Sequence, residues 1–212
     1  MQGIKNYIFD LDATLYQDNG EVEVDYERRI TEFFKIRLDM NTQQAKEASK
    51  ELLRKFRWEA QGIEQMFGVS KKEFMDYISD VEVSHLPPCP ELNNYLKQLG
   101  GKLFVFTDST VGHVRDSLKQ LGVDEDLFSG IFDAEMGNFA FKFNNESFER
   151  LFDCYQIDPK ESVLFEDKAI NLKFAKSFGM KTVLIAPSSQ NEAYIDFQFS
   201  DINKALETIT QK

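Results

Sequence analysis

Two carboxylates, Asp10 and Asp12, follow the first apolar run of the sequence and lie two residues apart. The run 7–9 has the composition of a buried strand, and the hydroxyl of Thr14 comes two residues after Asp12. Alternate side chains of an extended chain point the same way, so both acids would leave the carboxyl end of that strand on one side. Ligands of open α/β sheets bind at this edge. Taken alone, the pair fits a cation site and an acidic loop after a strand about equally well.

A second acidic pair, Glu166-Asp167, follows the apolar run 163–165. If both runs are strands of one parallel sheet, three or four negative charges meet at one edge. Such a cluster repels itself unless a hard cation is present, and carboxylate oxygens suit Mg²⁺. The alternative, two unrelated solvated turns, requires the same coincidence twice.

A third strand end carries Thr107-Asp108-Ser109, directly before a predicted helix. Free N–H groups and the dipole at a helix N-terminus favour an anion, so this segment could hold a phosphate. The competing interpretation is that Asp108 or Ser109 only caps the helix, and on this segment alone it is the better one.

Lys142 stands among aromatic and apolar residues, in the stretch 139–143. A lysine in such surroundings either extends its ammonium group to solvent or balances a buried anion. The local pattern alone favours the first interpretation.

The elements that must position these residues fall into two blocks. Strand signals alternate with helix signals in most of the chain, which predicts a parallel sheet covered on both faces. The expected strands are 4–9, 103–106, 130–132, 163–165, 182–186 and a weaker 194–199, and the expected helices of this block are 91–99, 111–121, 147–155, 169–178 and 201–210.

The second block is helical and interrupts the first. Amphipathic or capped segments at 25–36, from 42 to about 58, between Gly62 and Gly68, and at 71–78 predict four helices before the proline-rich connector 85–90. We therefore expect a Rossmann-like α/β core formed by residues 1–17 and 87–212, with residues 18–86 as an inserted all-helical cap domain.

Composition limits the partners. The net charge of −11 argues against a nucleic acid polymer or an anionic membrane surface. No apolar run has the length of a membrane span, and the first strand begins too early for a signal peptide. Cys89 and Cys154 have no metal-ligand or redox spacing, which indicates reduced thiols and a cytoplasmic protein. We also expect a monomer or weak dimer.

The four motifs, in this order, resemble those of the haloacid dehalogenase-like (HAD) hydrolase superfamily, and the inserted helices resemble its type I cap. The motifs are Asp10-Leu11-Asp12-Ala13-Thr14, Thr107, Lys142 and Glu166-Asp167. Within the superfamily the chain is most similar to the pyrimidine 5′-nucleotidase-like branch, through Thr14-Leu15-Tyr16, His113 after the second motif, and the stretches 165–172 and 179–184. It departs from that branch at Ala13, at Asp108-Ser109 in place of Asn-Ala, and at Phe143 in place of Pro.

The resemblance implies a Mg²⁺-dependent phosphomonoester hydrolase that works through an aspartyl-phosphate. Asp10 would be nucleophile and metal ligand, and Asp12 would be the general acid and base with its backbone carbonyl on the metal. Asp167 and Glu166 would complete the metal site, and Thr107, the N–H of Asp108 and Lys142 would bind the phosphoryl group. Asp12 also separates the chain from the dehalogenase branch, which lacks an acid at that position and uses no metal.

The expected substrate is a small phosphorylated metabolite, first of all a nucleoside 5′-monophosphate. Alternatives with the same chemistry are a phosphosugar phosphatase and a phosphomutase. An alternative of another class is a non-catalytic regulatory or binding protein on this fold, which the complete acid set disfavours.

Specificity would lie in the cap. The candidates are Arg54, Arg57, Trp58, Glu59 and Gln61, because an aromatic ring can stack on a base and an amide can read its edge. An equally good interpretation makes Trp58 ordinary helical core and the arginines solvated. We interpret His113 as structural.

Overall fold

The computed structural model describes residues 3–211, and the chain divides into two compact units. One unit comprises the N-terminal residues through Asp18 together with the chain from Leu86 onward, and the other comprises Asn19–His85. No helix within the described range is long and apolar enough to cross a bilayer.

The first unit is built on a six-stranded sheet in the order β3-β2-β1-β4-β5-β6, with every pair of neighbours parallel. Its strands are β1 (Asn6–Phe9), β2 (Lys102–Phe106), β3 (Phe128–Phe132), β4 (Ser162–Glu166), β5 (Lys181–Ile185) and β6 (Phe197–Phe199). The predicted parallel α/β sheet is therefore confirmed. β1 lies between β2 and β4, with Phe9 in register with Val105 and Phe165. The segments after these three strands consequently start at one edge.

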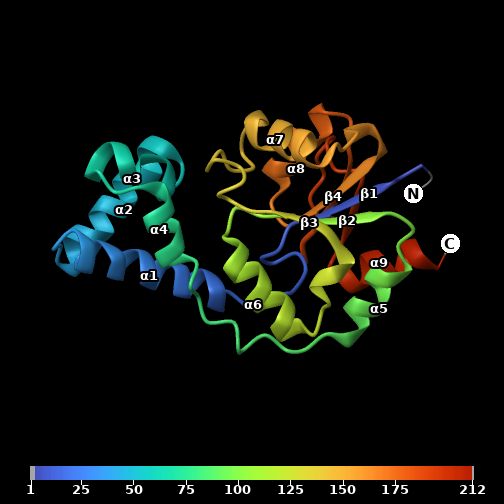
Figure 1. Cartoon of the computed structure of the whole chain (residues 1–212), viewed down its shortest axis with the longest axis horizontal. Coiled ribbons are helices and arrows are strands. Elements are labelled where there is room, and N and C mark those ends of the chain that lie inside the picture. The colour runs from blue at the N-terminus through green and yellow to red at the C-terminus, as the bar shows by residue number, and fades with distance from the viewer. Residues whose placement is uncertain (1–2, 212) are drawn as a thin grey trace. The chain divides into compact units, whose positions relative to one another are not determined.

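Helices cover both faces of the sheet: α7 and α8 lie on one side, and α5, α6 and α9 on the other (Figure 1). Their bounds are Pro90–Gln98 for α5, Val111–Leu121 for α6, Asn145–Tyr155 for α7, Ala169–Ser177 for α8 and Ile202–Thr210 for α9, with short 3₁₀ turns at Glu125–Leu127 and Pro159–Glu161. Alternate strand residues serve the two faces. Ile8, Phe104 and Leu164 belong to a buried cluster that includes Phe148 of α7 and Leu172 of α8.

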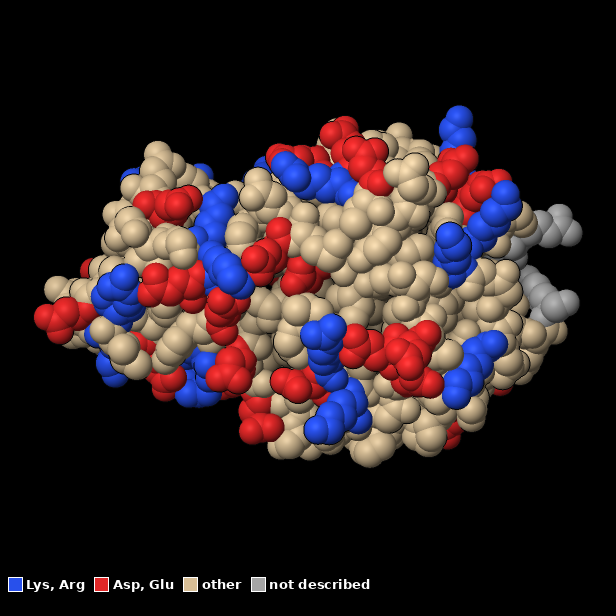
Figure 2. All heavy atoms as spheres, viewed as in Figure 1, with Lys and Arg blue, Asp and Glu red and all other residues tan. Residues whose placement is uncertain are grey.

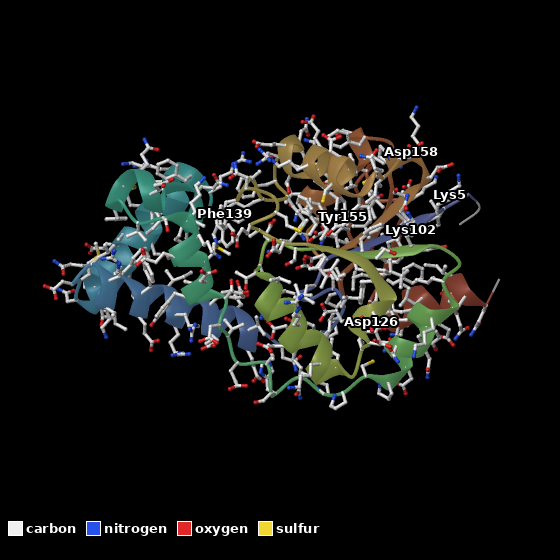
Figure 3. All side chains as sticks on the ribbon, viewed as in Figure 1. Lys5, Lys102, Asp126, Phe139, Tyr155 and Asp158 are labelled. Atoms are coloured by element: carbon white, nitrogen blue, oxygen red, sulfur yellow. The ribbon has the colours of Figure 1, made fainter. Side chains whose placement is uncertain are left out.

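The contact between β3 and α7 depends on a glycine. A Cβ at Gly130 would lie 2.3 Å from the ring of Tyr155, so only glycine allows this ring against the strand. The Tyr155 hydroxyl donates to the carbonyl of Ile131 over 2.9 Å, and Figure 3 shows Tyr155 on α7. This contact fixes α7, which follows the Lys142 loop, to the sheet.

The second unit contains α1 (Glu21–Arg37), α2 (Thr42–Phe56), α3 (Glu59–Phe67) and α4 (Lys71–Ile78). The side chains of Asn41 and Ser70 cap α2 and α4, as their positions before each helix suggest. The rings of Phe33, Phe34 and Phe74 pack together in its core. The first helix begins four residues before the predicted start because Gly20 and the acidic first turn (Glu21, Glu23) suit a helix N-terminus.

Candidate active site

The side chains of Lys142 and Asp10 meet at the carboxyl edge of the sheet. The N–H of Asp10 donates to the carbonyl of Phe165 over 2.9 Å, which ties the end of β1 to β4. The ammonium group of Lys142 contacts Asp10 Oδ1 and donates to Glu166 Oε2 over 2.8 Å. Since Lys142 is only 2% exposed, it balances buried anions and does not extend to solvent, contrary to what its local sequence favours.

The two carboxylates that contact this ammonium group form an acidic cluster with Asp167. Ligand atoms of Asp10, Glu166 and Asp167 all lie within 4.8 Å of one another. Burial, followed by the charge of Glu166, raises the pKa of Asp10 to about 7 and that of Asp167 to about 9. Burial lowers the pKa of Lys142, but the neighbouring carboxylates outweigh it and hold that pKa well above the usual value.

The charge and composition of this cluster fit a divalent cation. When all three carboxylates are ionised, they and the one ammonium group sum to −2, and the donors are the hard oxygens that Mg²⁺ prefers. A bound dication would relieve the repulsion that raises the pKa values of Asp10 and Asp167.

Asp12 has a different environment. It lies in a tight turn in which Leu15 N–H donates to the carbonyl of Leu11, and Ala13 adopts a left-handed backbone with φ 59°. Its Oδ1 contacts the Tyr16 hydroxyl and lies 2.6 Å from Nε2 of His113, while its Oδ2 accepts from Ser109 Oγ over 3.0 Å.

These contacts act on the pKa of Asp12. Burial raises the pKa of the carboxyl, but His113, Tyr16 and Ser109 together outweigh burial and lower it to about 2. His113, interpreted from the sequence as structural, therefore contacts the proposed acid–base group directly. Tyr16 offered a sequence signal, since it stands four residues after Asp12, whereas Ser109 and His113 lie 97 and 101 residues away along the chain.

The hydroxyls of Thr14 and Thr107 have separate functions. Thr14 Oγ1 donates to Asp10 Oδ2 over 2.9 Å, so this fully buried side chain holds the second oxygen of Asp10. Thr107 is also buried, and its Oγ1 accepts the N–H of Ser109 over 3.0 Å.

Asp108 holds the backbone of Lys142 by a hydrogen bond. Its Oδ1 accepts the backbone N–H of Lys142 over 2.9 Å. Neither Asp108 nor Ser109 caps α6: Thr110 is the N-cap residue, and the N–H of Val111 donates to Asp133 Oδ2 over 3.0 Å. The capping interpretation of this segment is therefore wrong.

The loop that carries Lys142 has an unusual backbone. Asn138, Phe139 and Phe141 have φ between 51° and 56°, in the left-handed region that costs a non-glycine residue about 1 kcal/mol or more. Figure 3 labels Phe139 on this loop. The hydrogen bond to Asp108 and the burial of Lys142 hold the loop in this conformation. No sequence pattern indicated this backbone conformation.

The candidates for substrate specificity belong to the other unit. Arg54 donates to both carboxylate oxygens of Glu51 over 2.8 and 2.9 Å, and Arg57 is the exposed C-cap of α2 with φ 69°. Trp58 is the N-cap residue of α3, Glu59 is buried and accepts from Ser49 over 2.6 Å, and Gln61 is half-buried. The structure thus brings the predicted residues of the core together and leaves these five in the helical unit.

The fold and the acidic edge define a protein with a Rossmann-like α/β core and a carboxylate cluster at the carboxyl ends of its strands. The chain belongs to the haloacid dehalogenase-like hydrolases, whose family model matches residues 7–185. No curated protein gave a significant match.

Solved structures share this fold over nearly the whole chain. A HAD phosphatase from Thermococcus onnurineus is 20% identical with a TM-score of 0.66, covering 97% of this chain and 98% of its own. The putative HAD-hydrolase YfnB from Bacillus subtilis, bound to magnesium, is 16% identical with a TM-score of 0.63 and the same coverage. The L-2-haloacid dehalogenase from Xanthobacter autotrophicus is 17% identical with a TM-score of 0.62, again covering 97% and 98%.

The outer charges are mixed on the face drawn in Figure 2, where acidic and basic side chains alternate over the surface. The charges that matter for the site are buried ones, because Asp10, Lys142 and Glu166 are each at most 5% exposed. These three charges are thus shielded from solvent, and the electrostatic interactions among them are strong.

Proposed function

We propose that this protein is a Mg²⁺-dependent phosphomonoester hydrolase that works through an aspartyl-phosphate. The observation that carries the proposal is the position of Asp10, a buried carboxylate at the carboxyl end of the central strand, between Lys142 and two further acids. Such a carboxylate can act as a nucleophile once its repulsion from a phosphate dianion is cancelled.

The metal would be held by Asp10, Asp167 and the backbone carbonyl of Asp12. Glu166 would bind the metal directly or through a water. Its two oxygens also accept hydrogen bonds, from Lys142 Nζ and from the N–H of Lys168 over 3.1 Å, so it orients Lys142 as well. When bound, Mg²⁺ neutralises charge on the nucleophile and on the phosphoryl oxygens.

Each side chain of the site would have its own role in the reaction. Asp10 attacks phosphorus, forming an O–P bond as the bond to the leaving oxygen breaks. Asp12 gives that oxygen a proton from its protonated form, which the negative charge of the bound phosphate would favour over the ionised form of the free protein. Asp12 next takes a proton from water, whose oxygen attacks the phosphorus of the aspartyl-phosphate and releases phosphate and free Asp10. Lys142, Thr107 and the N–H of Asp108 stabilise the remaining phosphoryl oxygens.

Two features favour phosphate over a haloacid as substrate, although dehalogenases are among the similar folds. Asp12 supplies an acid–base group that a dehalogenase of this superfamily lacks. The cluster formed by Lys142 and the three carboxylates, which carries −2 when the carboxylates are ionised, also suits a metal, which the dehalogenase reaction does not use.

The helical unit Asn19–His85 would serve as a type I cap that excludes water and selects the leaving group. The magnesium-bound YfnB structure reveals interdomain movement in that protein, which is consistent with such a role here. We propose a nucleoside 5′-monophosphate as the preferred substrate, on the resemblance of the motifs to the nucleotidase branch and on the presence of Trp58 and Gln61 in the proposed cap.

The test is release of phosphate from a panel of nucleoside monophosphates, sugar phosphates and 4-nitrophenyl phosphate, with Mg²⁺ and with EDTA. We expect Mg²⁺-dependent turnover that Asp10→Asn abolishes without unfolding the protein. The matched control is Asp126→Asn, which removes an exposed charge of the same unit and should leave turnover unchanged. Full activity of Asp10→Asn would refute the nucleophile, and no turnover of any phosphomonoester by the wild type would refute the proposed function. Transfer of the phosphoryl group to a second sugar hydroxyl in place of water would identify a mutase.

A further inference from the structure

Three hydrogen-bonding groups converge on the carboxylate of Asp12. The hydroxyl of Tyr16 comes from the same turn, the hydroxyl of Ser109 follows β2, and the imidazole of His113 projects from α6. Together they contact both oxygens of Asp12. Of the three groups, only the Tyr16 hydroxyl comes from the turn that carries Asp12.

The imidazole is held by its own surroundings. His113 is 2% exposed, and its neighbours Val114, Ser117 and Leu118 on α6 are buried as well. The start of α6 is attached to Asp133, which also accepts the N–H of Met136 over 2.9 Å. His113 therefore contacts Asp12 from a rigid element, which is how a positioning group reduces the motion of the side chain it holds.

Asp12 needs such support because its side chain is 29% exposed and its turn is short. A free aspartate samples several rotamers, and an acid–base group must lie within hydrogen-bonding distance of the atom that it protonates. Displacing such a group by about 1 Å can cost on the order of 100-fold in rate.

We propose that His113, assisted by Tyr16 and Ser109, is a positioning residue that holds Asp12 in the orientation needed for acid–base catalysis. This inference rests on the proposed hydrolase function, because it assigns His113 to the proton-transfer step of that reaction. It differs from a purely structural role for His113 in one measurable way: the loss of His113 should affect leaving groups unequally.

The experiment compares kcat/KM for phenyl phosphate and for 2,4-dinitrophenyl phosphate. Phenolate needs a proton to leave, whereas 2,4-dinitrophenolate leaves readily without one. We expect His113→Ala to lower kcat/KM for phenyl phosphate by about 10- to 100-fold, the usual effect of losing an orienting partner, and to change the value for 2,4-dinitrophenyl phosphate much less.

Two controls separate position from stability. Val114→Ala removes buried volume from the same helix without touching Asp12, and any loss it causes should be equal for both substrates. His113→Gln keeps an N–H donor near the place of Nε2 and should restore most of the activity on phenyl phosphate. If His113→Ala does not fold, Tyr16→Phe, which removes only a hydroxyl, tests the same inference by the same ratio.

The outcomes distinguish the two proposals. Equal losses on both substrates in His113→Ala and Tyr16→Phe, with an active wild type, would overturn the positioning role and leave the hydrolase intact. A wild type that hydrolyses neither substrate would overturn the proposed function. A selective loss on phenyl phosphate with rescue by His113→Gln would establish the positioning role.

Discussion

The ammonium group of Lys142 lies 2.8 Å from the carboxylate of Glu166, and both side chains are at most 2% exposed. A pair so deeply buried has lost its hydration, and each charge depends on the other. The same ammonium group also contacts Asp10, so Lys142 holds both the proposed nucleophile and Glu166 in place.

Replacement of Lys142 should therefore affect stability as well as activity. Lys142→Met leaves buried carboxylates without a counter-charge, and we expect a loss of about 3–5 kcal/mol in the free energy of unfolding at pH 8. Phosphatase activity should fall by at least about 100-fold, because the positive charge that would stabilise the phosphoryl oxygens is lost. Urea unfolding and steady-state kinetics measure the two effects.

The matched control for this prediction is Lys102→Met, which removes an exposed lysine at the start of β2. Its free energy of unfolding should stay within about 0.5 kcal/mol of wild type. A Lys142→Met protein as stable and as active as the control would contradict the buried ion pair.

Asp108→Asn should keep the loop and improve the binding of phosphate. An amide oxygen can still accept the N–H of Lys142, while the substitution removes a negative charge beside the proposed phosphate site. We expect inorganic phosphate to inhibit about 3- to 10-fold more strongly, since a tenfold change in affinity needs only ~1.4 kcal/mol, a size usual for one nearby charge.

Asp108→Ala is the comparison that tests the hydrogen bond itself. This variant removes both the charge and the acceptor, so the loop with its left-handed residues loses a support, and turnover should fall even though the repulsion is gone. Equal phosphate inhibition in wild type and Asp108→Asn would show that the charge does not act on the phosphate.

Mg²⁺ should raise the melting temperature more at pH 8.5 than at pH 6. In the metal-free protein the pKa of Asp10 is about 7 and that of Asp167 about 9, both above the ordinary value near 4. The folded state therefore holds protons that the unfolded state has lost, and stability falls as the pH rises through these values. A bound dication replaces the protons, so its stabilising effect grows over the same range.

Thermal unfolding in EDTA and in excess Mg²⁺ at the two pH values measures this difference. Asp167→Asn removes one ligand and should lose most of the Mg²⁺ effect, whereas Asp126→Asn should behave as wild type. A melting temperature that Mg²⁺ leaves unchanged at both pH values would argue against the metal site.

The sequence predicted the acids of this site because each of the two acidic pairs follows an apolar run, and parallel strands end at one edge. It did not predict the environment of Asp12, because the loop after β2 brings Ser109 to that side chain and the orientation of α6 brings His113 to it, and no periodicity specifies either. The burial of Lys142 was missed for a similar reason. The aromatic residues around it suit either orientation of the side chain, and the deciding partner Glu166 lies 24 residues away in sequence.

The specificity candidates of the helical unit can be ranked by their contacts. Arg54 is exposed and already paired with Glu51, so Arg54→Ala should leave substrate preference unchanged and serves as the control.

Trp58 and Gln61 are half-buried at the start of α3, and an aromatic ring and an amide are the groups that can stack on a base and read its edge. If the proposed nucleotidase specificity is right, Trp58→Ala should raise KM for a nucleoside monophosphate by about 5- to 30-fold, the effect of losing one base-stacking contact of ~1–2 kcal/mol. It should leave kcat/KM for 4-nitrophenyl phosphate, which has no base, nearly the same. A parallel loss on both substrates would instead mean that Trp58 supports the packing of α3, and the choice of substrate would have to be sought elsewhere in the helical unit.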